Sequence, residues 1–346
     1  MTLPEFWFAL VGFLFCGYFL LEGFDFGVGM LLPVLGRDDV DRRVMINTIG
    51  PVWDMNETWL IVAGASLFAA FPYWYATLFS GFYLPLLLIL AALILRGVAF
   101  EYRGKVDDPA WRARWDVAIV IGSTLPALLW GVAFANIVRG VPIDADGNFT
   151  GTLFTLLNPY GLLGGLAVVA LCATYGAIFV ALKTTGDIRG EARALAGRIG
   201  VAAVLLGAAF LVWTMLAHGD ALVWVLGLGT ALALLGGLYA NLRGREGWAF
   251  GLLGTTMIGV VATLFAALYP DVMPSSTDPA YSLTIANASS TPSTLSIMSW
   301  IALCTLPLVL AYQAWTYWVF RRRIGRGHIP TTPQHGAAPV VRDAGR

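Results

Sequence analysis

Nine apolar segments, each long enough to cross a lipid bilayer, constrain this chain more than any other feature of its sequence. A membrane-spanning helix needs about 20 mostly apolar residues. The candidate helices cover residues 5–33, 49–71, 77–97, 116–138, 161–182, 198–217, 221–241, 247–269 and 295–320. Hydrophobic residues make up 58% of the 346 residues and charged residues only 12%, which is about half the charged fraction of a soluble domain. The sequence therefore predicts an all-α, polytopic integral membrane protein with nine transmembrane helices.

The nine helices leave little room for another domain. Residues 1–326 are predicted to form a single transmembrane domain. Residues 327–346 are rich in Pro, Gly and Ala without periodicity, which is typical of a disordered tail. Only His218, Gly219 and Asp220 separate the sixth and seventh helices, so this pair is expected to form a tight antiparallel hairpin.

The positive residues predict the orientation of the helices, because cytoplasmic loops retain Lys and Arg. With nine alternating helices, 20 of the 21 positive residues fall at one end, Arg96 being counted with the loop that follows the third helix. Only Arg139 falls at the other end. We therefore expect the N-terminus outside and the C-terminus in the cytoplasm. The formal net charge of zero gives no indication of nucleic-acid binding.

Two carboxylates interrupt the first apolar segment, in the stretch "LLEGFDFGVGML". Glu22 and Asp25 are three residues apart, so both project from one face of a helix. Insertion of an ionised side chain near the membrane centre costs about 2.5 to 3.5 kcal/mol, so this face is expected to point into protein or water and to have a function. Gly23 and Gly27 form a small-xxx-small step, which lets another helix approach closely.

The second helix repeats the anomaly in "GPVWDMNETWLIVAG". Asp54 and Glu57, with Asn56 between them, occupy its first two turns and are flanked by Trp53 and Trp59. Together with the acids of the first helix they could form a ladder of proton carriers from the cytoplasm to the membrane core. Two structural interpretations stay open here. Asp54 could cap the helix N-terminus, and the tryptophans could belong to an interfacial belt.

The sequence offers no catalytic or metal centre of its own. Haem ligation by facing helices usually draws on histidines, and the histidines here are His218 at an expected helix end and His328 and His335 in the tail. We therefore expect no metal site and no haem ligand in this chain.

Several long motifs occur together in one order along residues 5–322. They are "EGFDFGVGML", "RRVMINTIGPVWDMNETWLIVAGASLFAAFP", "FSGFYLPLLLILAALILRGVAFEYR", "WDVAIVIGSTLPALLWGVAFANIVRGVP", "LLNPYGLLGG" and "YPDVMPSST". In these motifs the chain closely resembles subunit II of the cytochrome bd-type quinol oxidases. The resemblance implies two four-helix bundles plus one peripheral helix, in the cytoplasmic membrane of a bacterium.

The resemblance also implies the partners and cofactors. A haem-bearing subunit I would pair with this chain and carry haems b and d together with the quinol-oxidising loop. Lipid and menaquinone or ubiquinone would be further partners, and a small accessory subunit stays open.

By motif, the family's association with proton delivery carries over to Glu22, Asp25 and Asp54. Trp59 matches a tryptophan near the oxygen route, and Trp53 beside it belongs to the same haem or quinone vicinity. Some relatives have Asp in place of Glu22 and Gln in place of Glu57, which indicates an adjusted relay here.

Our hypothesis is a non-haem subunit of a quinol oxidase that reduces O2 to water. It would scaffold subunit I, supply cytoplasmic protons through Asp54, Glu57, Glu22 and Asp25, and border an O2 route or a quinone niche. One alternative is a purely structural partner whose acids only pair with subunit I. Another is an ion-coupled secondary transporter, whose site would lie at a broken helix, with "GFDFGVG" as the candidate.

Overall fold

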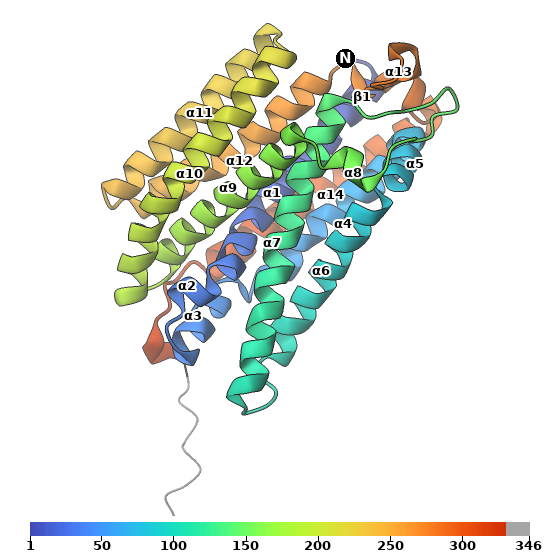
Figure 1. The fold of residues 1–346 in the computed structure, drawn as a ribbon. Helices are drawn as coiled ribbons and strands as arrows, with labels where there is room; N and C mark the ends of the chain where they lie inside the picture. The colour runs from blue at the N-terminus through green and yellow to red at the C-terminus, as the bar shows by residue number, and fades with distance from the viewer. Residues whose placement is uncertain (330–346) are drawn as a thin grey trace, which may run out of the picture.

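The computed structural model describes residues 1–329, and most of these residues are helical (Figure 1). The long helices are α1 (Leu3–Met30), α4 (Trp53–Ala70), α5 (Pro72–Gly81), α6 (Tyr83–Tyr102), α7 (Pro109–Arg139), α9 (Pro159–Lys183), α10 (Asp187–Ala217), α11 (Ala221–Leu242), α12 (Glu246–Leu268) and α14 (Pro292–Val319). The short ones are α2 (Leu32–Leu35), α3 (Asp39–Ile49), α8 (Leu153–Leu156) and α13 (Ile285–Ala288). Strands β1 (Asp271–Met273) and β2 (Leu283–Thr284) pair antiparallel. The predicted all-α class is confirmed.

Eight of the described helices are long and apolar enough to span a membrane, namely α1, α6, α7, α9, α10, α11, α12 and α14. The polar residues in the first turns of α4 keep this 18-residue helix out of that set. At 1.5 Å per residue it nevertheless extends over about 27 Å. The multi-pass character is confirmed, and the count of nine crossings stays a prediction.

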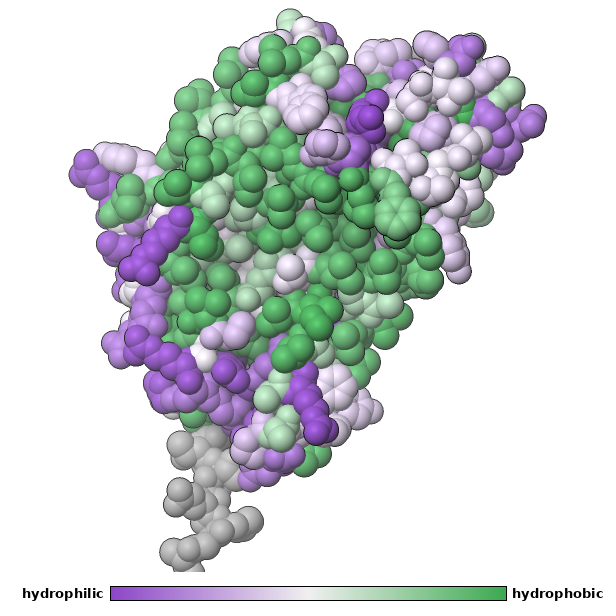
Figure 2. Space-filling view, viewed as in Figure 1, coloured by the Kyte–Doolittle hydropathy of each residue, from purple (hydrophilic) through white to green (hydrophobic). Residues whose placement is uncertain are grey.

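The long helices run between two polar ends that we name after the elements found there. Figure 1 shows α2, α3 and the α6–α7 turn at one end, the α3 end, and β1, α13 and the N-terminus at the other, the β1 end. Figure 2 shows hydrophilic residues gathered at these two ends and a broad apolar surface between them. Such an apolar belt is the expected surface of a protein solvated by lipid.

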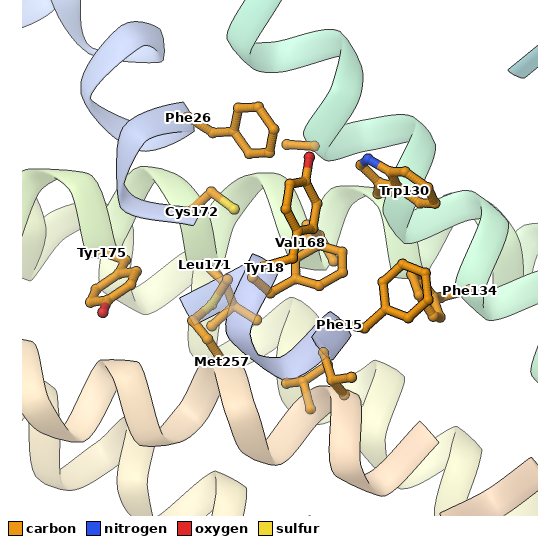
Figure 3. Packing of buried hydrophobic residues seen from close by; sticks show 14 of the residues in the cluster. Phe15, Tyr18, Phe26, Trp130, Phe134, Val168, Leu171, Cys172, Tyr175 and Met257 are labelled. Carbon is orange, nitrogen blue, oxygen red and sulfur yellow. The ribbon is translucent and has the colours of Figure 1, made fainter. Parts of the chain in front are cut away.

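Helix α1 lies at the centre of the structure. It contacts α4, α7, α9 and α12, and it has apolar side chains on all sides. Figure 3 shows Phe15 and Tyr18 of α1 packed beside Trp130 and Phe134 of α7. Phe15 meets Phe134 edge to face, with ring centroids 5.1 Å apart. The helices α1, α4, α6 and α7 and the helices α9 to α12 form two neighbouring groups. Helix α14 lies behind α1 and α4 in the view of Figure 1 and contacts both.

Glycine explains why α9 lies so close to α1. A Cβ atom added at Gly27 would stand 1.9 Å from the carbonyl oxygen of Cys172 and 2.7 Å from Cα of Gly176, both on α9. A Cβ atom added at Gly176 would in turn stand 2.3 Å from the carbonyl carbon of Gly27. The two backbones are therefore in direct contact, and the expectation of a close helix approach at Gly27 is confirmed.

Several element boundaries differ from the sequence-based expectations. The residues before the second span form α3, which the apolar pattern did not predict because this helix is polar. The third predicted helix is divided at Phe82 into α5 and α6, and α10 begins at Asp187 rather than near 198. The hairpin over His218–Asp220 is confirmed, since α10 ends at Ala217 and α11 begins at Ala221.

The predicted disordered tail, residues 327–346, lies mostly outside the described residues. Its first part differs from the expectation, because Arg326–His328 form a 3-10 helix at the α3 end. There the Arg326 guanidinium pairs with the carboxylate of Asp41, at 2.7 Å, and with that of Asp38.

Candidate functional site: a buried cluster of three acids around Arg96

The acids of α1 and α4 meet a buried cation that comes from α6. The Arg96 guanidinium pairs with the Glu22 carboxylate, and both side chains are 0% exposed. The same nitrogen, Nη2 of Arg96, lies 3.3 Å from Oε2 of Glu57, whose side chain is 21% exposed. One arginine therefore joins a fully buried carboxylate on α1 to a partly accessible one on α4.

Local packing makes room for the Arg96 side chain inside the helix bundle. A Cβ atom at Gly122 of α7 would stand 2.6 Å from Cβ of Arg96, so only glycine lets α7 pass this close. The guanidinium lies over the ring of Phe26, 4.7 Å from its centroid, and 5.9 Å from that of Phe100. Aromatic faces at these distances attract a cation, so the surroundings favour a charged Arg96.

Asp25, one helical turn beyond Glu22, accepts a hydrogen bond from the side-chain amide of Asn56. Nδ2 of Asn56 donates to Oδ2 of Asp25 at 2.7 Å and to the carbonyl oxygen of Leu21 at 3.3 Å. Oδ1 of Asn56 accepts from Nε2 of Gln313 at 3.0 Å and from the hydroxyl of Tyr317 at 2.8 Å. Asp25 is 0% exposed, and its contact with α14 runs through Asn56.

The cluster also contains buried polar atoms without a hydrogen-bond partner in the described part of the chain. These are Oε2 of Glu22, Oδ1 of Asp25, and Nε and Nη1 of Arg96. Buried polar groups in proteins are nearly always satisfied by protein or water. Ordered water is therefore expected to contact these atoms.

The remaining predicted site residues lie around this cluster. Asp54 is exposed on the outer side of α4, with no ion pair among the described residues. Trp53 is half-buried and packs on Phe100, with ring centroids 5.3 Å apart. Trp59 is buried, and its Nε1 donates to Oε1 of Gln313 at 3.5 Å. The structure thus brings Glu22, Glu57 and Asp25 together and leaves Asp54 on an open face.

Sequence reasoning placed Arg96 wrongly and missed two further residues. Arg96 was counted with the cytoplasmic loop residues, but it lies inside α6 and is 0% exposed. Its position within the apolar run "LLILAALILRGVAF" is the signal that could have identified it. Gln313 and Tyr317 carry no comparable signal, because polar and aromatic residues are common near the end of a spanning helix.

Neither a metal-binding cluster nor a histidine within a long helix is found among the described residues. No group of three or more His, Cys, Asp or Glu among them could hold a metal ion. Their two histidines also lie outside the long helices, His218 just after α10 and His328 in the 3-10 helix near the end of the described chain.

Comparisons with known proteins identify the family of this chain. The family model described as cytochrome bd terminal oxidase subunit II matches residues 3–320. Cytochrome bd ubiquinol oxidase subunit 2 of Bacillus subtilis is 44% identical over 329 residues, which cover 93% of this chain and 97% of the relative. Cytochrome bd-I ubiquinol oxidase subunit 2 of Escherichia coli K12 is 38% identical over 362 residues, which cover 93% and 95% of the two chains.

A solved structure has the same fold. A chain in the structure of bd oxidase from Geobacillus thermodenitrificans matches with a TM-score of 0.76, and the match covers 92% of this chain and 99% of that one. The sequence identity of 17% makes this a likeness of fold alone. Because the family model spans nearly all the described residues and both relatives are matched almost end to end, the chain belongs to the cytochrome bd terminal oxidase subunit II family.

Proposed function

We propose that this chain scaffolds a haem-bearing subunit I and delivers cytoplasmic protons to it for the reduction of O2 to water. The relatives are subunits of a ubiquinol oxidase, so the complex is an oxidoreductase with haem cofactors. We assign haems b and d to subunit I, and the position of both described histidines outside the long helices supports this assignment. When bound there, the haems supply the electron transfer and the O2 chemistry.

The observation that carries the proton path is the cluster of Glu57, Glu22 and Asp25. Glu57 is partly exposed and shares the Arg96 guanidinium with the fully buried Glu22. An arginine does not give up its proton in proteins, so Arg96 holds the carboxylates in place while the proton passes between their oxygens and water. The unpartnered Oε2 of Glu22 and Oδ1 of Asp25 are the atoms on which a proton would rest.

Asp54 supplies the entrance of the proposed path. It lies on the first turn of α4, next to the α3 end, and it faces away from the rest of this chain. An ionised side chain on a lipid-facing helix surface is costly. We therefore place subunit I, or water held between the subunits, against this face of α4.

The orientation and surroundings follow from the same proposal. Residues 1–326 act as one transmembrane domain in the bacterial cytoplasmic membrane, with the α3 end in the cytoplasm and the N-terminus outside. The apolar grooves beside α14, next to Trp59, are where an O2 route or a menaquinone or ubiquinone tail would run. A small accessory subunit is compatible with the exposed surface of α14.

A purely structural partner is the second candidate. Its expected pairing of the acids with subunit I is not needed for Glu22, which is paired with a cation of its own chain. This internal pair compensates the charge without any transport and favours a structural role. The transporter alternative receives no such support. It requires a helix break in "GFDFGVG", and α1 is continuous from Leu3 to Met30.

Non-titratable isosteres separate the two candidates. In the purified complex, Glu22→Gln and Asp25→Asn are each expected to lower oxygen consumption at least tenfold, because a positioned acid or base contributes about 10²- to 10⁴-fold. Haem absorption and subunit stoichiometry should stay as in the parent complex, because in Glu22→Gln the Arg96 guanidinium keeps Glu57 as a charged partner. Glu191→Gln, at a surface ion pair with Arg37, is the control. Unchanged turnover in both variants would leave only the structural role.

A further inference from the structure

Helix α14 touches the rest of the bundle at very few places. Its only buried residues are Leu295, Gln313 and Thr316. Apolar grooves of about 760 and 780 Å³ flank it on its two sides. Both grooves are lined by Gln313 and by Trp59 of α4, so this pair separates them. A buried glutamine on an otherwise exposed spanning helix requires an explanation.

The two attachments of α14 are polar and lie far apart along the helix. Near its N-terminus, Nε1 of Trp7 donates to the carbonyl oxygen of Leu295 at 3.2 Å and to Oγ of Ser299 at 3.0 Å. Four turns further on, Gln313 and Tyr317 both donate to Asn56. Only the second attachment reaches the acid cluster.

The chemistry of the neighbouring groups assigns the donors and acceptors of the second attachment. The indole nitrogen of Trp59 can only donate, so the atom of Gln313 that faces it is the oxygen, and the amide nitrogen of Gln313 faces Asn56. Oδ1 of Asn56 must accept from that nitrogen, which turns Nδ2 of Asn56 toward Asp25.

A second constraint gives the same assignment for Asn56. The backbone carbonyl of Leu21 can only accept, and it lies 3.3 Å from the same Nδ2 atom. The hydroxyl of Tyr317 adds a second donor to Oδ1. If the Asn56 amide were rotated, its Nδ2 would face Nε2 of Gln313, so that two donors would be in contact. Its Oδ1 would then face the carboxylate of Asp25, so that two acceptors would be in contact.

From this geometry we infer that Gln313 and Tyr317 are positioning residues for Asp25, acting through the amide of Asn56. Asn56 serves as a fixed donor and not as a proton carrier. The hydrogen bonds run in one direction, from Trp59 to Gln313, from Gln313 to Asn56 and from Asn56 to Asp25. Oδ2 of Asp25 is thereby occupied and Oδ1 is left free. The inference rests on the proposed proton path and assigns α14 a role within it.

The test compares variants at the two attachments of α14. Tyr317→Phe and Gln313→Leu remove donors to Asn56, whereas Trp7→Phe removes the hydrogen bonds at the other attachment and keeps an aromatic ring. All are examined in the assembled complex for oxygen consumption as a function of pH, and for the carboxyl band of Asp25 in infrared difference spectra, identified by its loss in Asp25→Asn.

We expect Tyr317→Phe and Gln313→Leu to lower turnover roughly two- to tenfold, the range that one hydrogen bond supplies, with an altered pH profile and a shifted carboxyl band. Trp7→Phe should leave the profile and the band as in the parent complex. In an Asn56→Ala background, Tyr317→Phe should have no further effect on either readout.

The failure of this inference can be distinguished from failure of the proton path. If Asp25→Asn abolishes turnover but Tyr317→Phe and Gln313→Leu leave the pH profile and the carboxyl band unchanged, the positioning role is wrong and the path stands. Lower complex yield for Trp7→Phe and Tyr317→Phe alike, with unchanged profile and band, would show that α14 is only held in place by these contacts. An unaltered Asp25→Asn enzyme would contradict the path itself, and the infrared band would still test the positioning.

Discussion

The Arg96 guanidinium on α6 is buried against the Glu22 carboxylate on α1, 74 residues earlier in the chain, and neither side chain is exposed. A charge buried alone is very costly, whereas a paired and hydrogen-bonded one is tolerated. The pair therefore fixes the position of α6 relative to α1. Glu22 depends on Arg96 for its compensating charge, whereas Arg96 also pairs with Glu57.

Removal of Arg96 alone should destabilise the complex strongly. Arg96→Gln leaves Glu22 buried without its cation, which costs about 3 to 5 kcal/mol. The double variant Arg96→Gln with Glu22→Gln should recover most of this loss, because the fully buried Glu22 charge is removed and Glu57, the other partner of Arg96, is partly exposed. Thermal unfolding of the detergent-solubilised complex, followed by tryptophan fluorescence, checks both expectations. Equal destabilisation of the single and double variants would contradict this account of the pair.

Gly27→Ala should prevent normal packing of α1 against α9. The new methyl group would overlap the carbonyl oxygen of Cys172, 1.9 Å from the ideal Cβ position, and both groups belong to helix backbones that cannot turn away. We expect a severe loss of assembled complex, measured by size-exclusion chromatography. Gly251→Ala is the matched control, because nothing lies within 4 Å of a Cβ atom there. Normal assembly of Gly27→Ala would show that the helices separate more easily than expected.

Asp54→Asn should change activity much more than stability. Asp54 is exposed and has no ion pair among the described residues, and surface substitutions usually change stability by less than about 0.5 kcal/mol. Glu57→Gln should lower stability more than Asp54→Asn, because Glu57 is mostly buried and pairs with Arg96. If both acids belong to the proton path, turnover should fall in both variants, while the thermal midpoint of Asp54→Asn stays close to that of the parent complex. A lowered midpoint with normal turnover would assign these acids a structural role instead.

Asp38 caps α3 and also pairs with Arg326, and two substitutions separate these contributions. Its Oδ1 accepts from the backbone N–H of Asp41 at 2.9 Å. Asp38→Ala removes both contacts and should cost about 1 kcal/mol through loss of the cap alone, whereas Asp38→Asn keeps the cap and loses the charge. Hydrogen exchange of the α3 amides measures the difference. Equal exchange in the two variants would show that the cap contributes nothing.

The contribution of the Asp38 charge should disappear in acid. The backbone N–H of Asp41, and then the Arg326 guanidinium, hold the pKa of Asp38 below its ordinary value of 3.8. A depressed pKa in the folded state gives stability that is complete above the unfolded value and is lost as the pH falls through the folded one. At pH 6 the α3 amides of the parent protein should therefore be more protected against hydrogen exchange than those of Asp38→Asn. Below pH 3.8 the protection in the parent protein should fall to that in Asp38→Asn. A difference that persists in acid would exclude the charge as its cause.

The sequence by itself determined the membrane character and most of the spanning helices. Apolar length is a local property, and a helix in lipid satisfies its own backbone hydrogen bonds, so "LLILAALILRGVAF" or "ALVWVLGLGTALALL" predicts a helix without knowledge of its neighbours. The acids at Glu22, Asp25 and Glu57 were also visible, because their insertion cost does not depend on the fold. The polar helix α3 was not predicted because it contributes nothing to an apolar pattern, and the division at Phe82 was not predicted because Phe82 is itself apolar.

Only the tertiary structure decided what those acids contact. Glu22 and Arg96 are 74 residues apart, and Asn56 and Tyr317 are 261 apart, so no periodicity or spacing connects them. The close approaches at Gly27 and Gly122 set which helix faces meet, and this packing turns Arg96 from an apparent loop residue into the cation of a buried cluster. It also brings the last spanning helix, through Gln313, to the acids of the first.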